Sequence, residues 1–218
     1  DVLLGTNNKD HLVIVTTFAS QIARLKSVIE FGKKMNRKIV FLGRSLHKYV
    51  TAAENIKLVN FSKDGELVGF ASQVRRKLKE IQKNPQKYLV VCTGNQGEPR
   101  AVLTRLALSE LPFTFKSGDH VVFSCRVIPS PINIANRSIL EEKLKDKGVR
   151  IFRDIHSSGH AAREDLRDLI NLVKPKHLFP AHGDITKLTP MAELAGEMGY
   201  TLGKDVHILR DGQFLKLE

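Results

Sequence analysis

Short apolar runs alternate with amphipathic segments along most of this chain. In the first amphipathic segment, Ile22, Leu25, Val28 and Ile29 recur at the spacing that places them on one face of a helix. We predict strands at 11–17, 38–42, 88–92, 119–124 and 149–152, and helices at 19–34, 45–53, 66–82, 99–108 and 132–147. This alternation predicts an α/β fold with a doubly wound, mainly parallel sheet.

The last third of the chain continues with a weaker pattern. Residues 161–173 have apolar positions at helical spacing, and 177–179 is typical of a short buried strand. Residues 206–209 and 213–217 are apolar runs on either side of an Asp-Gly pair, which predicts a hairpin.

The composition is that of a protein with a sizeable core. Hydrophobic residues make up 42% of the 218 positions, enough for one large domain or one and a half ordinary ones. No apolar run approaches the roughly 18 residues of a membrane span, and the first five residues lack the basic start of a signal peptide. Cys92 and Cys125 each end a strand-like run. We therefore expect buried thiols in a reducing cytoplasm, rather than a disulfide or a nucleophile, and no membrane partner.

Positive charge is concentrated in the first part of the chain. The net charge is +12 overall, and residues 1–90 hold 17 Lys and Arg against 7 Asp and Glu. Clusters at 33–38 and 75–79 could contact phosphates, which indicates a polyanion partner; a solvated basic face is the alternative. Aromatic residues are sparse and tryptophan is absent, so contact with a nucleic-acid backbone is favoured over base stacking.

Two histidine-bearing turns are the most informative local feature. His156-Ser157-Ser158-Gly159-His160 precedes the 161–173 segment, and Pro180-Ala181-His182-Gly183-Asp184 follows the short strand after it. Loops beside strands in α/β proteins often carry chemistry, although a histidine in a turn is also commonly just solvated. A zinc site would need three or four ligands. His156, His160, His177 and His182 could supply them, but the Ser-Ser-Gly turn disfavours helical pairing of the first two.

These two turns resemble the last two sequence motifs of the β-CASP metallo-β-lactamase nucleases, and among them the archaeal-type ribonuclease J branch. Further segments resemble that family in the same order along essentially the whole chain. They are Thr17-Phe18-Ala19-Ser20, Gly43-Arg44-Ser45, Thr93-Gly94-Asn95-Gln96-Gly97-Glu98-Pro99 and Asn136-Arg137.

The resemblance implies a division of the chain and a missing part. Residues 1–153 would form the β-CASP domain, and 154–218 the C-terminal segment of a metallo-β-lactamase αββα fold. The family's N-terminal His-x-His-x-Asp-His motif, which helps to bind two metal ions, usually zinc, is not found in the sequence. By the family pattern His182 would be one metal ligand, and His160 would be catalytic, contacting the scissile phosphate as an acid or a charge stabiliser. One imidazole does not hold a dinuclear centre, so we expect this chain alone to be inactive and to bind little zinc.

The resemblance also implies a pocket for the 5′-monophosphate of RNA. Ser20, Arg44 and Ser158 are the residues carried over to it, and Arg44 suits bidentate phosphate binding. The alternatives are a helix N-cap for Ser20 and a plain surface position for Arg44. The glycine-containing loop at 94–99 is not a Walker A motif. It would shape an RNA channel or a domain junction, or simply connect two elements.

We therefore expect the chain to be part of a zinc-dependent ribonuclease with 5′→3′ exonuclease activity. The sequence leaves open whether the enzyme also has endonuclease activity. Its substrate would be 5′-monophosphorylated RNA. The sequence leaves open whether the complete protein forms a homodimer. Two alternatives remain: a β-CASP endonuclease of the RNA 3′-end-processing type, and a noncatalytic RNA-binding module.

Overall fold

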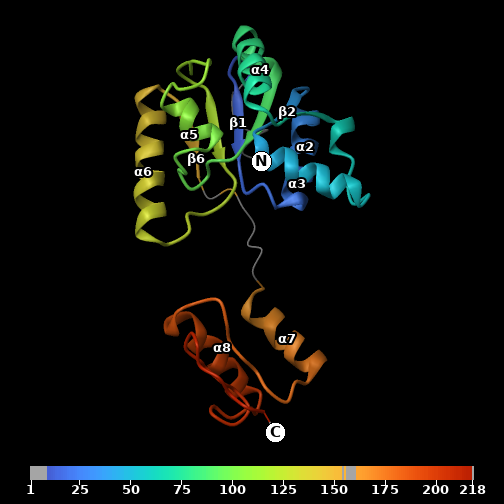
Figure 1. Ribbon diagram of the computed structural model, residues 1–218, viewed down its shortest axis with the longest axis vertical. Coiled ribbons are helices and arrows are strands. Elements are labelled where there is room, and N and C mark those ends of the chain that lie inside the picture. Colours follow the sequence, from blue (N-terminus) through green and yellow to red (C-terminus); the bar gives the residue numbers. More distant parts are fainter. Residues whose placement is uncertain (1–8, 154, 156–160, 218) are drawn as a thin grey trace. The chain divides into compact units, whose positions relative to one another are not determined.

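A computed structural model of the chain describes residues 9–153, 155 and 161–217. The chain forms two compact units, residues 1–156 and 157–218, each of which is described by itself (Figure 1). His156, Ser157, Ser158, Gly159 and His160 lie outside the described residues, so the predictions made for them are not addressed by the geometry.

The described part of the first unit is built on a six-stranded parallel sheet with the order β3-β2-β4-β1-β5-β6. The strands are β1 (Val13–Thr16), β2 (Lys38–Leu42), β3 (Gly65–Val68), β4 (Tyr88–Cys92), β5 (His120–Phe123) and β6 (Arg150–Phe152). Every residue of the adjacent central strands β1 and β4 is buried, as expected for a parallel sheet that is covered on both faces. The predicted α/β fold with a parallel sheet is confirmed.

Helices cover both faces of this sheet (Figure 1). They are α2 (Ile22–Lys34), α3 (Arg44–Asn55), α4 (Ala71–Lys83), α5 (Val102–Ala107) and α6 (Pro131–Asp146), with 3-10 turns η1 (Phe61–Lys63) and η2 (Pro85–Lys87). Val13 and Val15 of β1 belong to the hydrophobic cluster that includes α2 and α3. Ile14, between them, belongs to the opposite cluster with α4, α5 and α6. Alternate side chains of one strand therefore hold the two helical layers against the sheet.

One predicted helix began too early. The segment predicted as a helix at 66–82 starts with the edge strand β3, and the helix itself, α4, begins only at Ala71. Glu66 and its neighbours are partly exposed because β3 has a strand on one side only, so they lack the apolar run that marked the inner strands.

The second unit contains α7 (Arg163–Val173) and α8 (Ile185–Glu197). The strand predicted at 177–179 is reduced to a single bridge, between Leu178 and Val206. The predicted hairpin has its turn, where the Gln213 amide donates to the Arg210 carbonyl at 3.0 Å, but no strands pair across it in the described residues. No helix in the described parts of the chain is long and apolar enough to cross a bilayer.

Candidate functional site at the carboxyl edge of the sheet

The sheet topology creates a crevice where β1 and β4 end. These strands are neighbours, but the chain leaves β1 for helix α2 on one face and leaves β4 for helix α5 on the other. In α/β proteins, ligands bind outside the carboxyl ends of strands at such a point. A cavity of about 460 Å³ lies there. Its polar lining residues are Ser20, Arg44, Ser45, Tyr49, Thr93, Asn95, Glu98 and Arg100.

Ser20 and Arg44, which were predicted to act together, line this same crevice. Arg44 is the first residue of α3 and is exposed. Gly43 before it has φ +116°, a conformation that turns the chain sharply from β2 into the helix. Ser20 is also exposed, and the N-cap position of α2 is occupied by Gln21, so the N-cap alternative for Ser20 was wrong. What the two residues bind stays a prediction.

The charged side chains of the crevice favour an anion. Arg44 and Arg100 line it together with one carboxylate, that of Glu98. Glu98 accepts a hydrogen bond from the backbone amide of Gln96 at 3.0 Å, which holds the carboxylate against its own loop. Arg100 was not among the residues predicted from the sequence. Its position after β4, at the same edge as Arg44, is the signal that could have found it.

The two glycines of the loop after β4 permit close packing. Gly97 has φ +75°, and a Cβ atom there would lie 2.4 Å from the backbone of Asn136 in α6. Gly94 has φ +121°, and a Cβ atom there would lie 2.9 Å from the Leu103 side chain. Both positions therefore require glycine for steric reasons, and the loop is pressed onto α5 and α6.

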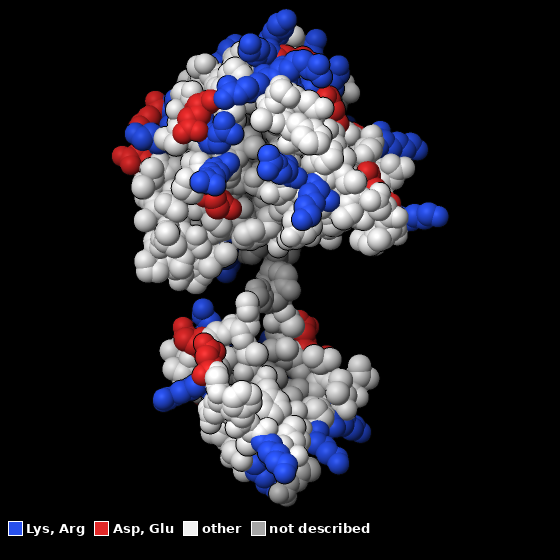
Figure 2. All heavy atoms as spheres, viewed as in Figure 1, with Lys and Arg blue, Asp and Glu red and all other residues white. Residues whose placement is uncertain are grey.

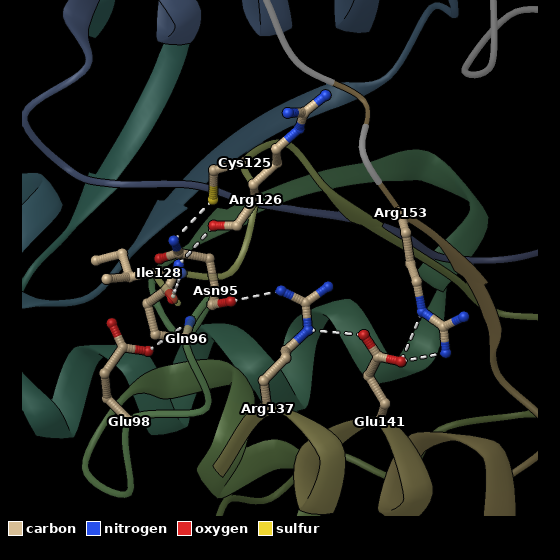
Figure 3. A network of polar contacts seen from close by, with 9 residues as sticks. All are labelled: Asn95, Gln96, Glu98, Cys125, Arg126, Ile128, Arg137, Glu141 and Arg153. Atoms are coloured by element: carbon tan, nitrogen blue, oxygen red, sulfur yellow. Dashed lines mark hydrogen bonds and ion pairs between the residues drawn. The ribbon is translucent and has the colours of Figure 1, made fainter. Parts of the chain in front are cut away.

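The same loop is tied to the loop after β5 (Figure 3). Asn95 donates from Nδ2 to the Cys125 sulfur at 2.7 Å. The side chain of Gln96 donates to the Arg126 carbonyl at 3.0 Å and accepts from the Ile128 amide at 2.8 Å. These contacts fix the loop that carries Asn95 and Glu98 at the crevice.

A buried arginine connects this loop to α6 (Figure 3). Arg137 donates from Nη1 to the Asn95 carbonyl at 2.6 Å and from Nε to Glu141 at 2.8 Å. Its guanidinium carbon lies 3.2 Å from the centre of the Phe123 ring. Burial lowers the pKa of Arg137, and the Glu141 carboxylate opposes that change. Glu141 also accepts from Arg153 Nε at 2.7 Å, so it bridges two arginines.

The cysteines behave as predicted from the sequence. Cys92 and Cys125 are both free and buried. Burial raises the pKa of both thiols, that of Cys125 to about 11, so little thiolate forms near neutral pH.

The chain is similar to known proteins of one family. Residues 10–141 match the model of the family described as ribonuclease J, beta-CASP domain. The chain belongs to this family. Residues 146–209 match a second model, described as a Zn-dependent metallo-hydrolase RNA specificity domain.

Similar curated proteins bear the name ribonuclease J. The chain is 47% identical to that of Methanocaldococcus jannaschii over 217 residues, which cover 99% of the chain and 48% of the relative. It is 46% identical to that of Pyrococcus abyssi over 205 residues, or 94% of the chain and 45% of the relative. The Sinorhizobium meliloti protein is 33% identical over 208 residues, or 93% of the chain and 34% of the relative. The chain thus spans about half the length of the two archaeal relatives, and the resemblance seen in its motifs is confirmed.

A metal centre of the kind expected in metallo-hydrolases is not assembled by the described residues. They contain no group of three or more His, Cys, Asp or Glu side chains that could hold a metal ion. His177 Nδ1 lies 3.1 Å from His207 Nε2, and Phe179 stacks on the His207 ring, so His177 is engaged in a packed pair. His182 is exposed and has φ +69°. The described residues therefore do not fit a zinc site by themselves, and we assign no cleavage step to them.

Proposed function

We propose that this chain is the RNA-holding part of a zinc-dependent ribonuclease that degrades 5′-monophosphorylated RNA in the 5′→3′ direction. Residues 1–153, which make up most of the first unit, are its β-CASP domain, and residues 154–218 are the C-terminal segment of its metallo-β-lactamase domain. The observation that carries the proposal is the convergence of Ser20, Arg44 and Arg100 on one crevice at the carboxyl edge of the sheet.

The crevice has the chemistry that a terminal phosphate requires. A 5′-monophosphate carries more charge than an internal phosphodiester and presents three oxygens. The planar guanidinium of Arg44 binds two such oxygens at once, and the hydroxyl of Ser20 donates to another. Arg44 also begins α3, a helix of 12 residues whose first backbone amides favour negative charge. Recognition of the end of the RNA, rather than of its bases, sets the register from which nucleotides are removed.

The remaining roles belong to the histidine turns. In the proposal His160 contacts the scissile phosphate, Ser158 contributes to the 5′-phosphate pocket, and His182 is one ligand of a centre with two zinc ions. The other ligands come from outside this chain, so the chain alone is inactive. A family model named for zinc-dependent metallo-hydrolases supports the metal assignment.

The decisive experiment compares two forms of one RNA, with a 5′-monophosphate or a 5′-hydroxyl, as substrates of the full-length protein. Arg44→Ala is expected to raise KM about 10-fold or more for the monophosphate and to leave the hydroxyl form within twofold, because one charged contact is worth roughly 1.5–3 kcal/mol. Lys48→Ala is the control, since Lys48 is exposed on the same helix but does not line the crevice. Equal losses on both substrates would make Arg44 a general backbone contact and overturn the proposal.

A further inference from the structure

The opposite edge of the sheet, where the strands begin, carries a surface that the crevice does not explain. All six strands of this sheet are parallel, so the segments that lead into them meet at one edge. Each of those segments has at least one exposed lysine. We name the set the lysine edge: Lys9, Lys34, Lys38, Lys63, Lys83, Lys87, Lys116, Lys145 and the neighbouring Arg150. Figure 2 shows blue side chains gathered over this end of the first unit, at the top of the view.

The two edges differ in the kind of positive charge they use. In the described part of the first unit, the first positively charged residue after each of the six strands is an arginine: Arg24, Arg44, Arg75, Arg100, Arg126 and Arg153. Arginine presents a fixed fork of donors that suits one oriented phosphate, whereas lysine is a hydrated point charge on a flexible stem. The crevice therefore suits a single defined phosphate, and the lysine edge suits a mobile series of phosphates.

The positive charge of the lysine edge is poorly compensated. Asp64 pairs with Lys33 at 2.7 Å and Asp146 with Lys143 at 3.7 Å, and neither of these lysines belongs to the edge. Asp119 interacts electrostatically with Lys116, but it is buried and accepts from two backbone amides. Glu80 interacts electrostatically with Lys38, but its carboxylate accepts hydrogen bonds from Lys77 and Tyr88. Among the residues that the structure describes, none of the nine members of the edge forms an ion pair, although Asp10 is exposed beside Lys9.

The lysine edge is too far from the crevice to strengthen phosphate binding there through electrostatic attraction. Strands of four or five residues, such as β1 and β4, are roughly 15 Å long at about 3.3 Å per residue. That length exceeds the Debye length of about 8 Å at physiological ionic strength, so salt screens the edge from a phosphate in the crevice. A basic surface at this distance therefore acts only on a ligand that is long enough to contact it directly.

We propose that the lysine edge is a second RNA-binding surface, which holds the body of a long RNA while its 5′ end lies in the crevice. The inference rests on the proposed function. No large aromatic side chain among the described exposed residues belongs to the edge, so the contacts are to the phosphate backbone and carry no sequence preference. Such binding releases counterions and weakens steeply as salt rises.

The test varies the length of the RNA in binding assays with the full-length protein. Lys38 is in register with Tyr88 across the inner strands β2 and β4, and Lys87 directly precedes Tyr88. Lys38→Glu with Lys87→Glu therefore removes charge from the middle of the edge. We expect the Kd for an RNA of about 30 nucleotides to rise about 10-fold. The slope of log Kd against log salt should fall by roughly 1.4, or 0.7 for each of two phosphates. The Kd for a 5′-monophosphorylated RNA of about 4 nucleotides, a small site by the standards of single-strand binders, should change less than twofold.

Two controls separate this inference from simpler explanations. Lys26→Glu with Lys48→Glu removes the same charge from exposed positions on α2 and α3, nearer the crevice, and should not show a length-dependent loss. Lys38→Gln with Lys87→Gln should give a smaller effect of the same kind. Equal loss for both RNA lengths, or no loss for either, would overturn the second surface. Arg44→Ala could weaken both 5′-monophosphate and 5′-hydroxyl RNA equally while the lysine substitutions still weaken only the long RNA. In that case the crevice assignment is wrong, but the lysine edge remains a second RNA-binding surface.

Discussion

Arg137 and Asn95 are 42 positions apart in the sequence, yet the Arg137 guanidinium donates to the Asn95 carbonyl at 2.6 Å. Asn95 lines the crevice, and Arg137 is a buried residue of α6. A helix on one face of the sheet therefore fixes the backbone of a loop at the carboxyl edge. Because the arginine is also paired with Glu141, the contact extends from the crevice into the interior of the first unit.

Replacing this arginine should be costly. Arg137→Met keeps much of the apolar stem but leaves the Glu141 carboxylate without its buried partner, and it also removes the bond to Asn95. Breaking a buried pair costs roughly 3–5 kcal/mol when the remaining charge has no other partner, and because Arg153 still donates to Glu141 we expect a loss near the lower end, about 3 kcal/mol. We expect the free energy of unfolding, measured in urea, to fall by that amount. The matched change Arg105→Met, in the exposed pair with Glu110, should cost about 1 kcal/mol or less. Similar losses in both variants would contradict the role given to Arg137.

Gly97→Ala should distort the crevice as well as destabilise the chain. The new Cβ atom would lie 2.4 Å from the Asn136 backbone, and φ +75° is itself unfavourable for alanine. Steric overlap and backbone strain each cost about 1–3 kcal/mol. Gly199→Ala is the control, since Gly199 has φ +91° but nothing within 4 Å, so it carries the backbone cost alone. Urea unfolding should show a clearly larger loss for Gly97→Ala, and equal losses would argue that the loop does not press on α6.

The sequence was sufficient for the elements whose local pattern and tertiary setting agree. The ranges predicted for β2 and β4, at 38–42 and 88–92, match the structure because inner parallel strands are continuous apolar runs. Ser20 and Arg44 were predicted from the family resemblance, and they line one crevice because each follows a strand of the same parallel sheet, whose strands all end at one edge.

The features that were not predicted from the sequence have specific physical causes. Helix α8 was not predicted, and Pro190 inside it is a residue that usually marks a helix end. The network around Arg137 was also missed, because a buried arginine cannot be distinguished from a surface one by residue type. Its position four residues before Glu141, on the buried face of α6 with Leu140 and Leu144, was the available signal.

The buried thiol of Cys125 should make the chain less stable at high pH. Burial raises the pKa of Cys125 to about 11, whereas an unfolded thiol ionises near about 8.5. The unfolded state therefore loses its proton first as pH rises. The stabilisation is fully present below about pH 8.5 and is lost as pH rises through about 11, an effect of about 3 kcal/mol at most. The free energy of unfolding, measured in urea at pH 8 and pH 11, should fall less between these two pH values in Cys125→Ala than in the parent chain. Identical pH effects in the two proteins would mean that burial does not raise the pKa of the Cys125 thiol.

Zinc binding by this chain alone should be weak or absent. The described residues offer no group of three ligands, and a stable zinc site needs three or four. Elemental analysis of dialysed protein should find far less than one zinc per chain, with little change in His182→Ala. About one tightly held zinc per chain would contradict this, and would revive a site made from His156, His160, His177 and His182.

The last prediction separates catalysis from metal binding, and it requires the full-length protein. His160→Ala should lower kcat by a factor of about 10² to 10⁴, the usual loss of a general acid or base, while the Kd for RNA changes little. A group that acts on the scissile phosphate contributes mainly in the transition state, so binding of the ground state should not depend on it. His182→Ala should instead lower the zinc content, and activity should fall in proportion to the metal lost. The metal content of His160→Ala is therefore the discriminating measurement. If it fell as it does in His182→Ala, the two histidines would share one role and the assignment of His160 to the phosphate would be wrong. If turnover stayed near normal with full metal, His160 would have no part in the reaction at all.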